Sequence, residues 1–444
     1  MEKKCEFWLP RKRRHCANAP LPNSLYCGNH NPSSVDLRVP CPIDPSHSVM
    51  KESLDSHVKR CPFAKQARAL ESQPYFSKGI NTSAVDCQDE IVSSGDKRKA
   101  IHGLTPLDFH HLITKIKSLH STISSEMRDS FVIPEKCSKW MNEMLDRQVP
   151  FQEKHAVQQA SIIGNMEAYG MIGKPYDECG ESHGLHKEKG EGEVAAAIVE
   201  FGAGRGYLAH MLADCYGFNK VFLVERRSYK LKADRSLRQK ESLSFERLRI
   251  DIEDLNLHGI ESLKELPYLA VGKHLCGPAT DLTIRCCLPD QCYPNEGLPF
   301  SSCMQGLALA TCCHHLCQWK HYINKDFFSN LGITKAVFHA ITWFSSWAVD
   351  ADHGSELSDM VDQGIHPTTR ETEELCGEEN RGVDEIIRKM PQLERAVLGF
   401  MCKEIIDIGR LLWLRNRGLE AQLLKYVPSN VSPENHLLVA KRPT

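Results

Sequence analysis

The sequence predicts an α/β protein in which helices cover both faces of a mostly parallel sheet, with two small modules ahead of this body. Three observations support the prediction. Short apolar runs alternate with helical stretches from about residue 194 onward. The first of these runs, residues 194–201, leads into three closely spaced glycines and then a helix. The first 61 residues instead concentrate cysteine and histidine at recurring spacings.

The composition fits a globular protein of two or three domains. Its 444 residues are 41% hydrophobic, which is enough for a sizeable core. No apolar run reaches about eighteen residues, and the chain does not begin with a basic segment followed by an apolar one. We therefore expect neither a membrane span nor a secretory signal, and we expect a location in the cytoplasm or the nucleus. The 19 cysteines are then thiols and metal ligands rather than disulfides.

Charge is distributed unevenly along the chain. The formal net charge is -2, yet residues 1–70 hold 12 Lys and Arg against 6 Asp and Glu. A basic module on an acidic body favours a polyanionic partner. A basic face that is merely solvated is the alternative.

The first cysteine-rich module is predicted over residues 1–35. Its candidate ligands have the spacing C-x10-C-x10-C-x2-H and are Cys5, Cys16, Cys27 and His30. Three thiolates and one imidazole suit a closed tetrahedral zinc site, which would stabilise a segment too short to build an apolar core. The first loop between these ligands carries Arg11, Lys12, Arg13 and Arg14.

The second module is predicted over residues 36–65. Its candidate ligands have the spacing C-x5-H-x9-H-x3-C and are Cys41, His47, His57 and Cys61. The last two lie one helical turn apart and so share a face, and we expect a second structural zinc ion here. A chance cluster in a cysteine-rich chain is the alternative, and two consecutive quartets make it the weaker one.

The stretch from residue 194 to 209 organises the body of the protein. Its buried strand ends near Glu200, and Gly202, Gly204 and Gly206 then turn the chain into a helix that begins near Tyr207. The spacing E-x-G-x-G-x-G differs from the dinucleotide-binding G-x-G-x-x-G and resembles the first motif of S-adenosylmethionine-dependent methyltransferases. We expect the motif to bind that cofactor; a plain strand-to-helix turn is the alternative.

Acidic residues follow the next two predicted strands. Glu225 ends a short apolar strand, where an acid can accept hydrogen bonds from both ribose hydroxyls of a nucleotide. Residues 247–255 predict a third strand, with Asp251 at its end. The resemblance to methyltransferases implies that Asp251 receives the adenine amino group, with Ile252 beside the ring. Asp254 is the alternative acid for this role.

The whole arrangement resembles one family. A CCCH finger, a CHHC finger and a methyltransferase core together resemble the eukaryotic tRNA 2'-O-ribose methyltransferases that modify nucleoside 4 of the acceptor stem, over nearly the whole chain. The resemblance implies a Rossmann-like class I methyltransferase sheet over residues 173–444, and S-adenosylmethionine as the methyl donor. It also implies that the fingers help to bind the tRNA acceptor stem.

Candidate catalytic residues follow the fourth predicted strand. Residues 268–286 predict a strand, a tight loop and a helix, and the loop would place Lys273, His274 and Asp281 at the carboxyl end of the sheet, where ligands bind. A cation or a base there would favour loss of the proton from a ribose hydroxyl. The Lys-Asp-Lys-Glu tetrad of other ribose methyltransferases is not found in this sequence, so these roles rest on position.

The fifth predicted strand, within residues 306–317, ends in a run of soft metal ligands. They are Cys312, Cys313, His314, His315 and Cys317. Neighbouring ligands cannot easily surround one tetrahedral ion, so a third metal site is the weaker interpretation. The resemblance places this run beside the methyl donor instead, which makes His314 and then His315 further catalytic candidates.

The other segments are expected to support this body. Residues 66–100 are predicted to be a linker, residues 101–172 to be helices that cover the core, and residues 350–382 to be an acidic insertion. The C-terminal part predicts a helix and a reversed strand pair that completes the sheet, and Arg410 and Glu434 within it are expected to be structural.

Two other functions remain open at this level. A base or small-molecule methyltransferase would use the same core on another acceptor atom, and the two RNA-suited fingers argue against the small-molecule version only. A non-catalytic RNA-binding or splicing factor with a decayed core would keep the fingers, although the glycines and acids of the core are intact.

Overall fold

The computed structural model divides into two compact units, Met1–Phe76 and Ser77–Thr444. The structure describes residues 4–9, 14–17, 19–20, 24–27, 38–43, 47–82, 89–123, 127–146, 153–173, 196–227, 243–289, 303–348 and 382–443. Of the predicted insertion at 350–382, residues 350–381 lie outside these ranges.

The N-terminal unit is built around its cysteines. Two short antiparallel pairs, β1 (Trp8–Leu9) with β2 (Arg14–His15) and β3 (Arg38–Pro40) with β4 (Ser48–Met50), are followed by α1 (Leu54–Arg60) and α2 (Ala64–Glu71). Its buried clusters consist almost entirely of cysteines: three thiols with Tyr26 in one, and two thiols with Ala64, Ile43 and Phe63 in the other. Cores this small cannot hold a fold by apolar burial alone, which favours metal ions as the stabilising groups.

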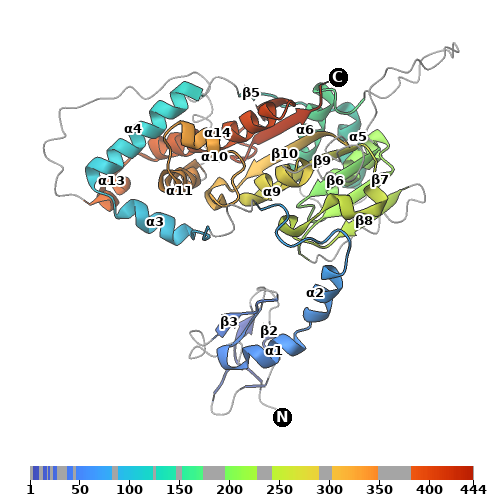
Figure 1. Cartoon of the computed structure of the whole chain (residues 1–444), viewed down its shortest axis with the longest axis horizontal. Coiled ribbons are helices and arrows are strands. Elements are labelled where there is room, and N and C mark those ends of the chain that lie inside the picture. The colour runs from blue at the N-terminus through green and yellow to red at the C-terminus, as the bar shows by residue number, and fades with distance from the viewer. Residues whose placement is uncertain are drawn as a thin grey trace. The chain divides into compact units, whose positions relative to one another are not determined.

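The second unit contains an eight-stranded sheet, and Figure 1 shows how its strands are arranged. Its strands are β5 (Arg128–Asp129), β6 (Ala197–Phe201), β7 (Lys220–Val224), β8 (Ser244–Leu248), β9 (Tyr268–Cys276), β10 (Met304–Cys312), β11 (Glu420–Lys425) and β12 (His436–Lys441). The order across the sheet is β5-β11-β12-β10-β9-β6-β7-β8, and among these strands β12 alone runs antiparallel to its neighbours. The antiparallel pair of β11 and β12 is the C-terminal strand pair that the sequence predicted, and β12 is its reversed member.

Helices cover both faces of this sheet. The described helices of this unit are α3 (Ser94–His102), α4 (Pro106–Ile123), α5 (Glu135–Asp146), α6 (Glu153–Ala168), α7 (Tyr207–Tyr216), α9 (Pro278–Cys287), α10 (Lys325–Asn330), α11 (Lys335–Phe344), α13 (Val383–Lys389) and α14 (Gln392–Asn416). Ala310 joins the core under α6 and α7, whereas the next residue, Thr311, bonds Asp407 of α14. Successive strand residues point to opposite faces, so the sheet is covered on both sides, as predicted.

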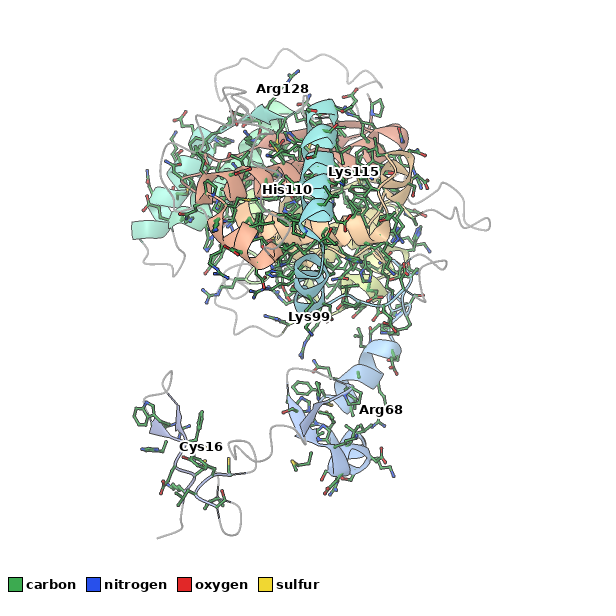
Figure 2. The ribbon with its side chains drawn as sticks, turned by 90° about the vertical axis from the view of Figure 1, so that its left-hand side faces the viewer. Cys16, Arg68, Lys99, His110, Lys115 and Arg128 are labelled. Carbon is green, nitrogen blue, oxygen red and sulfur yellow. The ribbon has the colours of Figure 1, made fainter. Side chains whose placement is uncertain are left out.

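A second apolar core lies away from the sheet. It joins α4, α11 and α14 through side chains such as Phe109, Ile116, Phe338 and Ile405. The apolar side of α4 therefore packs within this chain. Figure 2 shows α4 across the face of this unit, with His110 and Lys115 labelled on it. Within the described ranges, no helix is both long enough and apolar enough to cross a membrane.

The structure differs from the sequence prediction in two strands. The third strand ends at Leu248, and Ile252–Asp254 instead form a 3-10 turn because the side chain of Asp251 accepts the Glu253 amide. The fourth strand, β9, continues to Cys276, because it is paired with β10 up to Cys312. Lys273 and His274 therefore lie within a strand, and their predicted loop position is wrong.

Candidate active site

The glycine turn after β6 has the geometry that its spacing predicts. Gly202, Gly204 and Gly206 have φ values of 59°, 52° and 76°, a left-handed backbone that other residues adopt at a cost. A Cβ on Gly206 would lie 2.5 Å from Cδ1 of Leu223, so this glycine is required for packing. A Cβ on Gly204 would meet no atom within 4 Å, so the backbone there borders open space. The turn thus offers a cradle for a ligand at Gly204.

Glu200 supports this turn from inside the protein. Its carboxylate accepts the Ala209 amide of α7 at 2.9 Å, and only 4% of the residue is exposed. Burial raises the pKa of Glu200 to about 8, although the charges of Arg247 and Lys273 oppose the change. A buried acid with this contact fixes the angle between strand and helix, and it acts on a ligand through the turn.

Glu225 and Asp251 lie at the ends of the next two strands, next to the turn. One oxygen of Glu225 accepts the Gly204 amide at 3.0 Å, and the other accepts the Arg227 amide at 2.8 Å. Asp251 accepts from the Arg226 guanidinium at 2.9 Å. Both acids remain partly exposed. Partly exposed carboxylates beside a glycine cradle suit the hydroxyl and amino groups of a nucleoside.

A segment that we expected to be a linker is packed against this edge. Asn81 donates to the carbonyls of Ile252 and Leu255, at 2.6 and 2.7 Å. Asp254, the predicted substitute for Asp251, accepts the Gly79 amide at 2.8 Å and pairs with Lys78 at 3.2 Å. Asp254 therefore anchors the chain at 77–82, and Asp251 is the acid left for a ligand. Ile252, 8% exposed, is held in place by the same contacts.

Lys273 is buried at the carboxyl end of β9. Its ammonium nitrogen lies 2.9 Å from Nδ1 of His155 on α6. Burial lowers the pKa of Lys273 to about 7, although the charge of Glu200 opposes this. The sequence analysis did not select His155. It lies among other polar residues of a predicted helix, and its spacing from Lys273 does not indicate that the two residues meet. Nothing is described of the His274 side chain.

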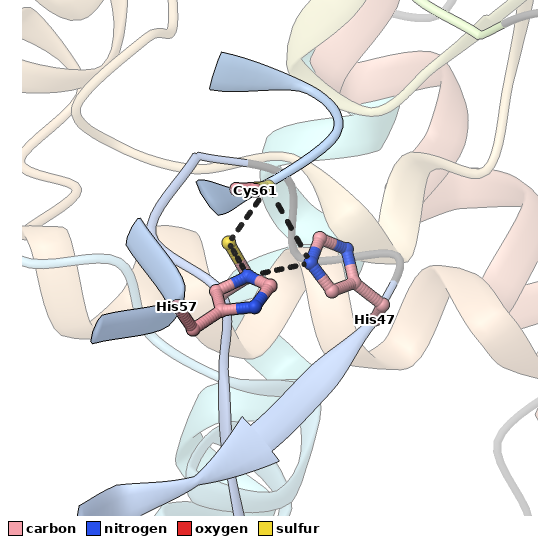
Figure 3. Close-up of side chains that lie close together, drawn as sticks. His47, His57 and Cys61 are labelled. Atoms are coloured by element: carbon pink, nitrogen blue, oxygen red, sulfur yellow. Dashed lines mark hydrogen bonds between the residues drawn. The ribbon is translucent and has the colours of Figure 1, made fainter. Parts of the chain in front are cut away.

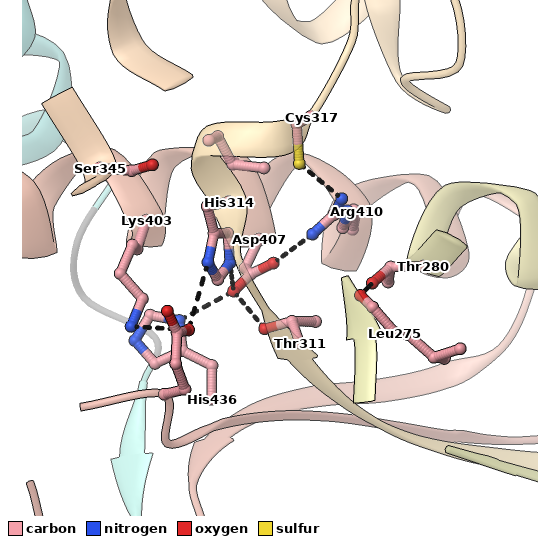
Figure 4. Close-up of polar contacts among 12 residues, drawn as sticks. Leu275, Thr280, Thr311, His314, Cys317, Ser345, Lys403, Asp407, Arg410 and His436 are labelled. Carbon is pink, nitrogen blue, oxygen red and sulfur yellow. Dashed lines mark hydrogen bonds and ion pairs between the residues drawn. The ribbon is translucent and has the colours of Figure 1, made fainter. Parts of the chain in front are cut away.

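His314 belongs to a buried polar network on the other side of the sheet end (Figure 4). One oxygen of Asp407 accepts from Thr311, His314 and His436, each at 2.8 Å. Burial opposes protonation of His314, but the Asp407 and Glu434 carboxylates outweigh it and raise the pKa of this imidazole. His314 is 1% exposed. A buried imidazole that donates to a carboxylate is poorly placed to accept a proton from a substrate.

Arg410 extends this network to α9. Its guanidinium donates to both oxygens of Asp281, at 2.5 and 3.1 Å, and to Asp407 at 2.8 Å. Burial opposes ionisation of both groups, yet the Asp281 and Asp407 carboxylates hold the pKa of Arg410 well above its usual range. In the same way His314, His436 and Arg410 hold the pKa of Asp407 well below its usual range. Asp281, 1% exposed, is thus the partner of a buried cation, which favours a structural role over the catalytic role that the sequence suggested.

Glu434 and Lys403 complete the structural set. Their charged groups lie 3.2 Å apart, and Lys403 also donates to the Pro433 carbonyl at 2.5 Å. Although burial opposes it, the charge of Lys403 lowers the pKa of Glu434 to about 2. Sequence analysis assigned structural roles to Arg410 and Glu434 but missed Asp407, Lys403 and His436. The sequence does not show which distant residue pairs with a charged residue inside an apolar stretch.

The second N-terminal quartet converges in space (Figure 3). The sulfurs of Cys41 and Cys61 lie 3.8 Å apart, and Nε2 of His57 lies 3.3 Å from the Cys41 sulfur and 3.0 Å from Nε2 of His47. All four ligand atoms lie within 4.8 Å of one another. Cys5, Cys16 and Cys27 form a similar group, with 4.0 Å between the last two sulfurs. Their predicted fourth partner, His30, lies outside the described residues. These donor sets fit zinc.

Fold and site together define a class I α/β methyltransferase with cysteine- and histidine-rich N-terminal modules. Comparison with known families then gives the particular one. The family profile described as "Methyltransferase TRM13" matches residues 157–441, and the chain belongs to this family. The profiles described as "CCCH zinc finger in TRM13 protein" and "U11-48K-like CHHC zinc finger" match residues 3–31 and 38–62.

Individual relatives agree with this assignment. A rice protein (Oryza sativa subsp. japonica) named "tRNA:m(4)X modification enzyme TRM13" is 53% identical over 52% of this chain and 91% of its own length. The mouse protein "tRNA:m(4)X modification enzyme TRM13 homolog" is 29% identical over 98% of this chain and 94% of its own length. The yeast (Saccharomyces cerevisiae) protein "tRNA:m(4)X modification enzyme TRM13" is 26% identical over 99% of this chain and 96% of its own.

Proposed function

We propose that this protein transfers a methyl group from S-adenosylmethionine to the ribose 2'-hydroxyl of nucleoside 4 in the tRNA acceptor stem. The observation that carries the proposal is family membership over residues 157–441, together with full-length relatives named as tRNA:m(4)X modification enzymes. The two finger matches support a nucleic-acid substrate and disfavour a small-molecule acceptor.

The cofactor site is formed by the carboxyl ends of β6, β7 and β8. Gly202, Gly204 and Gly206 form the turn, the backbone at Gly204 leaves room for a ligand, and Glu200 holds the turn in place. Glu225 would accept the ribose hydroxyls, and Asp251 the adenine amino group beside Ile252. S-adenosylmethionine, when bound, supplies an electrophilic methyl group. The task of the protein is then to orient the acceptor hydroxyl and to exclude water.

Lys273 is the first candidate for the base. With a pKa lowered to about 7, its amine is substantially neutral at physiological pH and can accept the proton that the ribose hydroxyl loses. His155, 2.9 Å away, holds the amine in position. His274, the next residue, stays an alternative base, whereas His314 is bound to Asp407 and is the weaker one.

The fingers are assigned to tRNA binding. Each would hold one structural zinc ion, the first through Cys5, Cys16, Cys27 and His30, and the second through Cys41, His47, His57 and Cys61. The basic residues Arg11 to Arg14 would contact phosphates of the acceptor stem. An enzyme that modifies tRNA would act in the cytoplasm or the nucleus.

The test is methyl transfer to unmodified tRNA. Purified protein is incubated with labelled S-adenosylmethionine and tRNA transcripts, and the product is digested and analysed by mass spectrometry. A 2'-O-methyl group on nucleoside 4 is the expected result, and Gly204→Asp protein serves as the blank. A methylated base would replace the proposal with base methylation. Binding of tRNA without binding of the cofactor would identify a non-catalytic RNA-binding protein.

A further inference from the structure

Three cysteines converge at the carboxyl ends of β9 and β10, outside both fingers. They are Cys276, Cys312 and Cys313, and their sulfurs all lie within 4.8 Å of one another. The sulfurs of Cys276 and Cys312 are 3.4 Å apart. None of the three forms a disulfide. Cys276 and Cys312 are register partners in neighbouring parallel strands, so the sheet itself brings them together.

The backbone at Cys313 brings the third thiol to the same place. In a regular strand, successive side chains point to opposite faces, so Cys312 and Cys313 would diverge. Cys313 instead has a φ of 50°, one of the few non-glycine residues with a left-handed backbone among those described. Such a conformation is strained for a residue with a side chain and tends to mark functional positions. Here it joins two adjacent thiols into one cluster.

The cluster also differs from the ligand set that the sequence suggested. His314 donates to Asp407, and Cys317 lies 3.3 Å from the Arg410 guanidinium, so neither belongs to it. The third member of the cluster is instead Cys276, which lies on β9. The objection that neighbouring ligands cannot surround one ion applies to the run at 312–317 alone, and a ligand from β9 removes much of it.

We propose that Cys276, Cys312 and Cys313 bind a zinc-class metal ion as a third site of this protein. A tetrahedral ion with Zn–S bonds of about 2.3 Å separates its sulfurs by roughly 3.8 Å. The fingers show 4.0 Å between Cys16 and Cys27 and 3.8 Å between Cys41 and Cys61. The 3.4 Å between Cys276 and Cys312 is close to these values and far from the ~2.05 Å of a disulfide. Three protein thiolates leave a fourth position for a non-protein ligand.

Native mass spectrometry of the full-length protein counts the bound ions. We expect Cys276→Ala to hold one zinc fewer than the wild-type protein, and Cys303→Ala, which alters a partly buried cysteine outside the cluster, to hold the same number. Cys41→Ala calibrates the loss of one ion from a finger. Equal zinc content in wild-type and Cys276→Ala protein would overturn the proposal, as would a wild-type mass two hydrogens lower that maps to a Cys276–Cys312 disulfide.

A second measurement needs no variant. Wild-type protein is alkylated before and after treatment with a zinc chelator, and the modified peptides are mapped. Because Cys276 and Cys313 are partly exposed, bound metal should protect them before chelation only. Equal labelling under both conditions would contradict the proposal. Neither readout uses methyl transfer, so failure of this site is distinct from failure of the proposed function.

Discussion

Burial is the main reason why Lys273 is suited to act as a base. A lysine in water is protonated far above neutral pH, but this one has a pKa lowered to about 7, mainly because it is buried. The nearby Glu200 has its pKa raised to about 8 by the same cause. The end of the sheet next to the glycine turn therefore holds two groups that change charge near physiological pH, which is a frequent property of active sites.

The pH dependence of methyl transfer tests the role of Lys273. If its neutral amine is the base, the rate at saturating substrate should rise with pH through about 7 and then level, because deprotonation creates the active form. Lys273→Met should lower the rate by about 10²–10⁴-fold and abolish this rise. Single-turnover rates between pH 5.5 and 9 provide the measurement.

His314→Gln is the comparison for that experiment. It should lower the rate less and keep the rise with pH, since His314 donates to Asp407. Calorimetry on each variant would check that the cofactor still binds. If His314→Gln loses the pH dependence and Lys273→Met keeps it, the histidine is the base.

At the level of elements, Asp407 and Arg410 fasten α14 to the sheet. Asp407 accepts from β10 and β12 through Thr311 and His436, while Arg410 reaches Asp281 on α9. Asp407→Asn keeps the shape but leaves a buried guanidinium with one carboxylate fewer, so we expect a loss of about 3–5 kcal/mol in unfolding free energy. Urea denaturation measures it. The same change at exposed Asp326, on α10, should stay within about 0.5 kcal/mol, and a similarly small effect at Asp407 would refute the structural role.

The turn between β6 and α7 is tested at Gly204. The open space beside this residue is where a ligand would approach the backbone, so Gly204→Asp should reduce cofactor affinity at least 100-fold, by volume and by charge beside Glu225. Isothermal titration with S-adenosylmethionine gives the affinity. Gly332→Asp is the matched control, because Gly332 also has a positive φ, of 63°, and open space around it, but lies between α10 and α11. Equal affinity of both variants would remove Gly204 from the site.

The elements show what a sequence can predict. Apolar runs and the glycine spacing predicted β6, β7, β10 and the helix at Tyr207 because these depend on local pattern. The end of β9 was misplaced because it depends on pairing with β10, which no local signal contains. The docked segment at 77–82 was missed for the same reason: its hydrogen bonds reach residues more than 170 positions away.

Across the whole molecule, candidate sites were predictable to the extent that they depend on spacing. The finger ligands and the acids at strand ends could be selected from their spacing in the sequence. In the structure the described finger ligands converge, and Glu225 accepts the Gly204 amide of the glycine turn. Partners drawn from distant segments did not follow: His155 for Lys273, Asp407 for His314, and Cys276 for Cys312. In each case several residues of the same type occur in the sequence, and only the folded structure shows which of them is the partner.

The division into two units predicts that cofactor binding and tRNA binding can be lost separately. Cys41→Ser removes one of four converging ligands, and without its metal the second finger has only a few apolar side chains to hold it. We expect tRNA affinity to fall about tenfold or more, while affinity for S-adenosylmethionine stays unchanged, because the glycine turn and both acids belong to the other unit. Filter binding and calorimetry on one preparation measure the two constants, with Cys303→Ser as the control. A fall in both constants would mean that finger and core depend on one another, and unchanged tRNA affinity would leave recognition of the acceptor stem to the methyltransferase unit.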